Sequence, residues 1–167
     1  MARLPPTARH VVPGAMAAFR FNHMELTVPK GLLTEHRAAI SEFYGDVFGF
    51  DALDVPILNQ TGLLLRTDPE TSQFILVTEQ AKHMQSPGYD HLGFLQDSRA
   101  DVDRLLERCR ARQERDERVQ IKTYDDLEFG PTTTHAFYVR YLLPLWFDVQ
   151  VIEYAKGAEP AKRWEYR

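Results

Sequence analysis

The stretch Tyr89-Asp90-His91-Leu92-Gly93-Phe94 decides the fold, because the chain contains its pattern twice. Earlier in the sequence, Phe21-Asn22-His23-Met24-Glu25-Leu26 has the same order of an aromatic residue, a short polar residue, a histidine and an apolar residue. Each copy opens a run of alternating apolar and polar residues, which predicts a β-strand. Further along, Val77-Thr78-Glu79 aligns with Val151-Ile152-Glu153 in the same way. These repeats predict a duplicated structural unit.

The composition is that of a compact globular protein. The chain has 167 residues, of which 44% are hydrophobic, and this is enough to form a core. The net charge of −4 gives no reason to expect nucleic acid or an anionic membrane as a partner. No run approaches the roughly 20 apolar residues that span a bilayer, and the single cysteine, Cys109, excludes an intramolecular disulfide. We therefore expect a soluble, cytoplasmic protein with no nucleic-acid or membrane partner.

Hydrophobic periodicity and turn residues divide the chain into two modules, residues 19–86 and 87–156, each with the predicted order βαβββ. Residues 1–18 are expected to form a flexible N-terminal arm, and residues 157–167 a C-terminal tail. The predicted helices cover residues 34–47, which Gly49 should stop, and 99–115, which Asp97 and Ser98 can cap. The predicted strands cover residues 19–29, 51–58, 62–67 and 73–79 in the first module, and the strand at His91, 120–124, 136–142 and 145–154 in the second. The acidic segment 125–128 is expected to be a turn.

Four segments together resemble the vicinal oxygen chelate superfamily, which includes glyoxalases, bleomycin and fosfomycin resistance proteins, and extradiol dioxygenases. They are residues 22–28, 43–50, 90–94 and 151–154. The most specific is Phe43-Tyr44-Gly45-Asp46-Val47-Phe48-Gly49-Phe50, and the resemblance covers roughly residues 19 to 156. It implies an α+β fold of two βαβββ modules, whose curved mixed sheets enclose a metal or ligand cavity. Relatives of this length commonly pair, so the resemblance also implies a homodimer.

The resemblance implies a metal site formed by His23, His91 and Glu153. Two neutral imidazoles and one carboxylate bind a divalent metal and leave positions open for substrate and for dioxygen or water. Fe(II) or Mn(II) is the favoured ion, with Zn, Ni or Co as alternatives. The other interpretation is that both histidines are ordinary strand residues and Glu153 is a solvent-facing charge. Glu79 is a candidate fourth ligand, as in relatives of glyoxalase I, although a small change of register would put Leu76 in that place.

His135, Tyr124 and Tyr141 are candidate catalytic groups, because they lie near the presumed cavity and can hold or transfer protons. Ordinary packing is the alternative for the two tyrosines. No glycine-rich phosphate loop or other cofactor motif is present in the sequence. The resemblance implies a metal-dependent, extradiol-dioxygenase-like enzyme that acts on a small vicinal-oxygen substrate. The alternatives are an isomerase, lyase or glutathione transferase of the same superfamily, or a non-catalytic protein that binds a small molecule such as an antibiotic.

Overall fold

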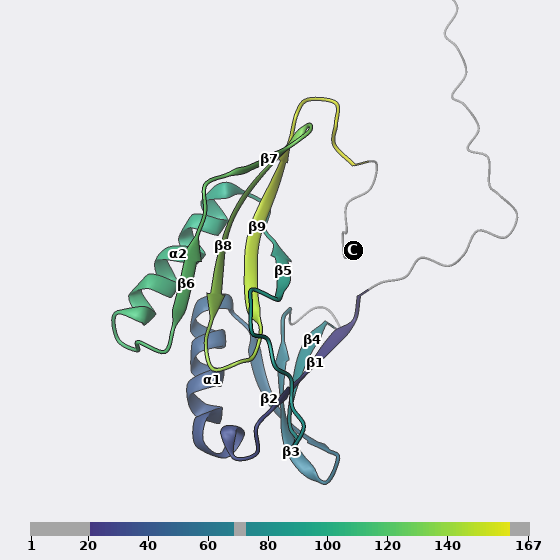
Figure 1. Cartoon of the computed structure of the whole chain (residues 1–167), viewed down its shortest axis with the longest axis vertical. Helices are drawn as coiled ribbons and strands as arrows, with labels where there is room; N and C mark the ends of the chain where they lie inside the picture. The colour runs from purple at the N-terminus through teal and green to yellow at the C-terminus, as the bar shows by residue number, and fades with distance from the viewer. Residues whose placement is uncertain (1–20, 69–72, 161–167) are drawn as a thin grey trace, which may run out of the picture.

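The computed structural model describes residues 21–68 and 73–160, which form two mixed β-sheets and two helices (Figure 1). The first sheet has the strand order β1-β4-β3-β2, and the second has the order β5-β9-β8-β6, with β7 paired to β8. The elements of the first module are β1 (His23–Val28), α1 (Leu32–Phe48), β2 (Asp51–Ile57), β3 (Gln60–Arg66) and β4 (Phe74–Glu79). Those of the second are β5 (His91–Leu95), α2 (Arg99–Gln113), β6 (Gln120–Thr123), β7 (Leu127–Phe129), β8 (Thr132–Arg140) and β9 (Trp146–Tyr154).

This architecture confirms the expected α+β fold of two βαβββ modules, with sheets that are curved but not closed. In each module the first strand pairs in parallel with the last strand, and the remaining pairs are antiparallel. The expected N-terminal arm, residues 1–18, lies outside the described residues, as do residues 161–167 of the expected tail. Among the described helices, neither has the length and apolar character that crossing a membrane requires.

The helices end and begin where the sequence provides caps. Helix α1 stops at Phe48 because Gly49 adopts a left-handed backbone conformation with φ 74°, and its N–H donates to the Gly45 carbonyl. Helix α2 starts after Ser98, whose side chain accepts a hydrogen bond from the Asp101 N–H. Both signals were read from the sequence.

The second module contains one strand that the sequence analysis did not predict. The short strand β7 pairs with the beginning of β8, so that Glu128 lies opposite Thr133. Gly130, with φ 57°, turns the chain between the two strands. Strand β8 therefore begins at Thr132, before the predicted position 136, and the acidic segment 125–128 is a turn only in its first part.

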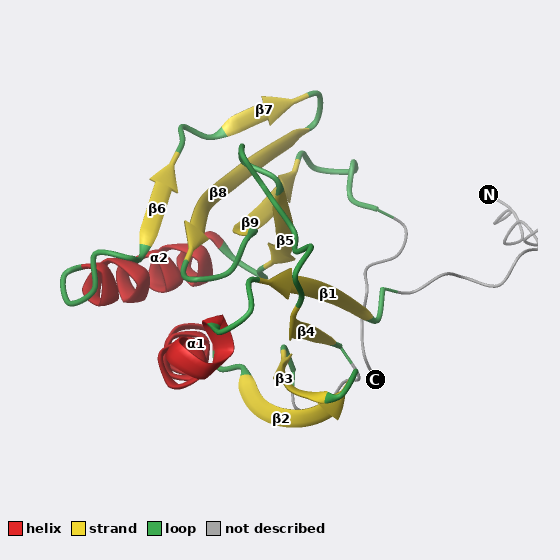
Figure 2. Cartoon of the chain, turned by 60° about the horizontal axis from the view of Figure 1, so that its bottom comes forward, coloured by secondary structure: helices red, strands yellow, loops and turns green. Residues whose placement is uncertain are grey.

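Both helices cover the same side of the two curved sheets, as Figure 2 shows. We call this side the helix face and the opposite side the open face. Because side chains alternate along a strand, each strand contributes every second residue to each face. The helix-face residues of β1, β4, β8 and β9 form one apolar core with the helices, namely Leu26, Val28, Ile75, Val77, Phe137, Val139, Phe147 and Val149.

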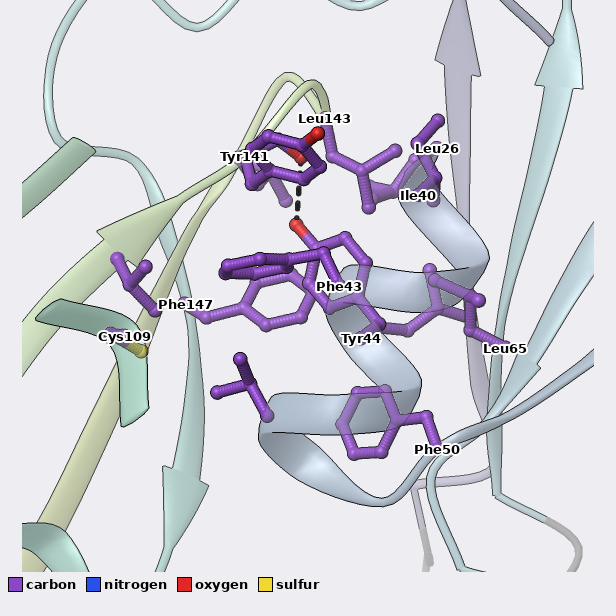
Figure 3. Close-up of a cluster of buried hydrophobic side chains, with 14 of the residues drawn as sticks. Leu26, Ile40, Phe43, Tyr44, Phe50, Leu65, Cys109, Tyr141, Leu143 and Phe147 are labelled. Atoms are coloured by element: carbon purple, nitrogen blue, oxygen red, sulfur yellow. Dashed lines mark hydrogen bonds between the residues drawn. The ribbon is translucent and has the colours of Figure 1, made fainter. Parts of the chain in front are cut away.

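The core joins the two modules through Tyr44 of α1 (Figure 3). Its ring lies 5.0 Å from the ring of Phe147 on β9, measured between centroids. Its hydroxyl donates a 3.0 Å hydrogen bond to the carbonyl oxygen of Tyr141, just after β8. Burial raises the pKa of Tyr44, so the hydroxyl remains a donor. The first helix and the second sheet are therefore held in one continuous core.

Candidate metal and substrate site

The open face of the second sheet brings a histidine and a carboxylate together. His91 begins β5 and pairs in register with Trp146 of β9. Asp148 lies two residues beyond Trp146 and therefore points to the same face. Its Oδ2 atom is 3.7 Å from Nε2 of His91. The site thus arises from the first strand and the last strand of one module.

A backbone hydrogen bond determines which nitrogen of His91 is available for binding. The Tyr89 carbonyl oxygen lies 2.9 Å from Nδ1 of His91. A carbonyl can only accept, so Nδ1 carries the proton in the neutral ring, and Nε2 presents its lone pair. Metal-binding histidines are commonly oriented in this way by the bond that the other ring nitrogen makes.

Asp148 is an unusual residue for its surroundings. It is 6% exposed, and within residues 21–68 and 73–160 its Oδ1 atom is buried without a hydrogen-bond partner. Burial raises the pKa of this carboxyl, and the nearby His91 opposes the shift only in part. A buried carboxylate without sufficient partners is costly, and a bound cation would remove that cost.

The spacing of these two groups fits a divalent metal ion. Protein nitrogen and oxygen ligands lie about 2.0–2.2 Å from such an ion. Two ligands of one ion are therefore separated by about 3 to 4 Å, and the 3.7 Å between Nε2 and Oδ2 falls in this interval. The distance exceeds that of a hydrogen bond. The donor set and the partnerless Oδ1 atom are thus suited to a metal.

His23 occupies the equivalent position in the first module. It begins β1, pairs in register with Phe74, and stacks on that ring at a centroid distance of 4.8 Å. Its Nδ1 lies 2.8 Å from the side-chain oxygen of Asn22. The residue equivalent to Asp148 is Leu76, two positions after Phe74, so this module offers a histidine without a carboxylate beside it. Leu76 in this slot was one of the alternatives left open by the sequence.

The structure does not bring His23, His91 and Glu153 together, and the described residues contain no cluster of three histidine, cysteine or acidic side chains that could hold a metal. Glu153 lies on the helix face of β9, because five positions separate it from Asp148 and side chains alternate. Its carboxylate oxygen accepts a 2.6 Å hydrogen bond from Arg99 of α2. The carboxylate beside His91 is therefore Asp148, which the sequence analysis did not select.

Glu79 also lies on a helix face. Its Oε1 atom accepts a 2.7 Å hydrogen bond from the backbone N–H of Leu33 and so completes the first turn of α1. The structure thus gives Glu79 a capping contact and places it away from the open face.

The three candidate catalytic residues have different surroundings. Tyr124 lies on the open face, where its ring is 5.0 Å from that of Tyr138. His135 lies on the helix face, with Nε2 2.9 Å from Asp103 and Nδ1 2.8 Å from Asp126. Tyr141 is buried in the core and donates a 2.7 Å hydrogen bond to Asp116. Only Tyr124 shares a face with His91.

Tyr138 is a site residue that the sequence analysis missed. It pairs with Asp148 across β8 and β9, and its ring lies 4.8 Å from that of His91. Burial and the proximity of Asp148 raise the pKa of Tyr138, and burial likewise raises that of Tyr124. Both phenols are therefore proton donors at neutral pH. A usable signal for Asp148 was present, since it is the one acid in the apolar run Leu145-Trp146-Phe147-Asp148-Val149.

A cavity of about 740 Å³ lies elsewhere, at the junction of the modules. Its lining includes Phe48, Phe50, Phe94 and Arg104. His23, His91 and Asp148 are not among the lining residues. The metal-compatible pair is thus on a curved surface rather than inside this cavity.

Comparisons with known proteins agree with the fold. Residues 20–135 match the family model of the Glyoxalase/Bleomycin resistance protein/Dioxygenase superfamily. No curated protein matches the sequence. A putative glyoxalase family protein from Bacillus anthracis is a structural neighbour with a TM-score of 0.57 and 15% identity, covering 83% of this chain and 98% of that chain.

Two further neighbours have the same fold. The fosfomycin resistance protein FosX from Listeria monocytogenes, complexed with Mn(II) and sulfate, has a TM-score of 0.56 and 16% identity, covering 81% of this chain and 91% of its own. A virulence protein from Salmonella typhimurium has a TM-score of 0.54 and 17% identity, covering 81% and 98% respectively. At these identities the likeness is one of fold.

Proposed function

Because this chain belongs to the glyoxalase/bleomycin resistance protein/dioxygenase superfamily, we propose that it is a metal-dependent enzyme whose small substrate presents two adjacent oxygens. The observation that carries this proposal is the pairing of His91 with Asp148. The Nε2 atom of His91, whose Nδ1 atom bonds the Tyr89 carbonyl, lies 3.7 Å from a buried carboxylate whose second oxygen has no partner among the described residues. Such a pair is the start of a metal-binding set.

The proposed ligands are His91, Asp148 and His23, with Asp148 taking the role that the sequence suggested for Glu153. Two histidines and one carboxylate occupy one face of a metal ion and leave the remaining positions for substrate and for dioxygen or water. Bound there, the ion would act as a Lewis acid and orient both substrate oxygens. We propose that His23 comes from a second copy of the chain, because the described part of one copy holds no three-donor cluster.

The reaction we propose first is extradiol-type cleavage of a dihydroxylated aromatic ring by dioxygen, since the two-histidine-one-carboxylate set is typical of non-haem Fe(II) oxygenases. Tyr124 and Tyr138 would then donate protons or hydrogen bonds to substrate oxygens beside His91. Their raised pKa values keep them protonated at neutral pH. A metal-dependent isomerase or lyase is the second candidate, and the Mn(II) in the FosX neighbour supports testing that metal as well.

Metal binding tests the proposal directly. Titration of chelator-treated protein with Mn(II) and anaerobically with Fe(II), followed by calorimetry, should give about one site per chain. His91→Ala and Asp148→Asn should each weaken binding by at least about 100-fold, since each removes a ligand. Glu153→Gln is the matched control, because it neutralises a carboxylate on the opposite face of the same strand, and it should retain wild-type affinity. Equal affinity in wild type and His91→Ala would overturn the proposed site.

A second measurement separates an enzyme from a binding protein. Fe(II)-loaded protein is mixed with dihydroxylated aromatic compounds, and oxygen uptake is recorded. Oxygen uptake that depends on His91 supports dioxygenase chemistry. Metal binding without any turnover, with Fe(II) or with Mn(II), would instead favour the non-catalytic binding protein.

A further inference from the structure

A lysine shares the open face with the proposed metal ligands. Lys122 of β6 pairs with Tyr138 of β8, and Tyr138 pairs with Asp148 of β9. Residues paired in register point to the same face of a sheet. Lys122, Tyr138 and Asp148 therefore form one row across three strands, with the lysine and the carboxylate about 10 Å apart at their Cα atoms.

Aromatic rings hold the ammonium group of Lys122. Its Nζ atom is 3.9 Å from the ring centroid of Tyr89 and 5.2 Å from that of Tyr124. Tyr89 is two residues before His91, so the lysine side chain extends from β6 toward the metal-binding side. Cation–π contacts of this kind restrict the position of the charge without neutralising it.

Among the described residues, arginines form ion pairs with carboxylates but lysines form none. In that part of the chain, therefore, no carboxylate compensates the charge of Lys122. The pKa of Asp148 responds to burial and to His91, and Lys122 has no part in it. The open face therefore carries a positioned cation that is available to an anionic ligand.

The surroundings of Lys122 also favour a flat ligand. Tyr89 contacts Tyr138 at 6.4 Å and Trp146 at 5.4 Å between ring centroids, while Tyr124 contacts Tyr138 at 5.0 Å. These rings form an aromatic wall between the lysine and the pair of His91 and Asp148. Aromatic walls gain contact area with planar rings in offset or edge arrangements.

We propose that Lys122 recognises the anionic group of a planar aromatic substrate, whose adjacent oxygens reach the site of His91 and Asp148. This inference rests on the proposed function and adds the substrate class, an aromatic acid. Lys122 is then a specificity-determining residue: it contributes to binding the anionic group, and the chemistry takes place at the other end of the ligand.

Two probes that differ only in charge test this assignment, 3,4-dihydroxybenzoate and the neutral 3,4-dihydroxybenzamide. Calorimetry on Mn(II)-loaded protein should show the acid binding at least tenfold more tightly than the amide. Lys122→Gln should reduce this ratio to near one by weakening the acid alone, and Lys122→Arg should keep most of it. Lys82→Gln, which removes an exposed lysine after β4, is the charge-matched control and should leave the ratio unchanged. The same order is expected, with weaker binding, in metal-free protein.

The outcomes distinguish the two proposals. If wild type and His91→Ala bind Mn(II) equally, the metal site fails, whatever Lys122 does. If Mn(II) binds as proposed but Lys122→Gln leaves the preference for the acid intact, or weakens both probes equally, the role of Lys122 is wrong. Failure of loaded wild type to bind either probe would overturn the aromatic acid as substrate class. Should Lys122→Gln not fold, loss of the acid preference at high salt in wild type is the corresponding test, since screening weakens an exposed ionic contact.

Discussion

Asp148 and Leu76 show what one residue changes between two otherwise similar modules. Both lie two positions beyond the partner of the first-strand histidine, on the open face. Leu76 is 7% exposed and packs as an apolar residue, whereas Asp148 is 6% exposed and holds a carboxylate oxygen with no partner in the described structure. The second module therefore carries an energetic cost that the first avoids. A cation bound beside His91 would offset it.

Replacing Asp148 by Leu should therefore stabilise the metal-free protein. Leaving a buried polar group unsatisfied costs about 1–3 kcal/mol, which corresponds to a rise of several degrees in melting temperature for a chain of this size. Because burial raises the folded-state pKa of Asp148, its ionised form opposes folding. The penalty is absent at low pH and grows as pH rises through the unfolded-state value toward the folded-state value.

The melting temperature of Asp148→Leu should thus exceed that of wild type at pH 8, with a smaller difference near pH 4, and metal should add nothing to it. The control is Leu76→Asp, which introduces the same carboxylate into the first module and should lower stability at pH 8. A lower melting temperature for Asp148→Leu at pH 8 would mean that Asp148 stabilises the apo fold through His91.

At the scale of elements, strand β9 serves two purposes on its two faces. Its open face carries Asp148, while Glu153 on its helix face joins a chain of polar contacts. Arg99 of α2 bonds both Glu153 and Asp126, at 2.6 and 2.7 Å. His135 of β8 then contacts Asp126 and Asp103 of α2. This network ties α2 to the sheet and to the loop that begins with Tyr124.

The network predicts a pH-dependent stability. Burial lowers the pKa of His135, but the hydrogen bonds that the ring donates to the carboxylates of Asp103 and Asp126 outweigh this effect, so the net shift of the pKa is upward. Arg99 nearby opposes the shift. A histidine with a raised folded-state pKa contributes stability that is fully present below its unfolded value of about 6.5 and is lost as pH rises through the folded value.

We therefore expect His135→Asn to lower the melting temperature most at pH 5 to 6, with the difference from wild type shrinking toward pH 9. Thermal unfolding across this range measures the effect. His36→Asn is the control, since the ion pair that His36 makes in the described structure is with its neighbour Glu35 on the same helix. A difference that stays constant across the range would mean that the charge of His135 contributes nothing.

At the scale of the whole molecule, the two histidines lie on edge strands. Strands β1 and β5 are each at the edge of a sheet, and large apolar side chains near them are exposed: Phe21 is 54% exposed, Tyr89 50% and Leu95 67%. Open edges with exposed apolar residues favour association. We propose a homodimer in which His23 of one copy approaches His91 and Asp148 of the other.

Mixing two defective chains tests this arrangement. His23→Ala and His91→Ala should each abolish metal binding at every site of their own dimers. Mixed, unfolded and refolded together, they should recover about a quarter of the wild-type metal content, because half of the dimers are mixed and each mixed dimer has one intact site. Mixing His91→Ala with Asp148→Asn is the control: these two residues belong to the same half-site, so every site of a mixed dimer lacks one of them, and no metal binding should be recovered.

Two results would contradict the shared site. Recovery of no metal in the His23→Ala and His91→Ala mixture, with dimers present by sedimentation, would mean that both histidines act within one chain or not at all. A monomer at micromolar concentration that binds metal with wild-type affinity would contradict it as well.

Local patterns in the sequence determined much of this protein. Alternation predicted the strands that carry His23 and His91, Gly49 and Ser98 predicted the helix boundaries, and the repeat predicted two modules of one fold. These features depend on contacts within a few residues, so the sequence alone expresses them. The short strand β7 escaped notice because three exposed residues hold no periodic pattern.

Tertiary structure alone decided which carboxylate lies beside which histidine. The sequence aligned Glu79 with Glu153, whereas pairing with β1 and β5 makes Glu79 equivalent to Val151 and Leu76 equivalent to Asp148. The physical reason is that the face of a strand residue depends on its register with a partner far away in the chain, and an odd number of positions reverses the face. Because of this register, Glu153 contacts Arg99 of helix α2, whereas Asp148 faces His91.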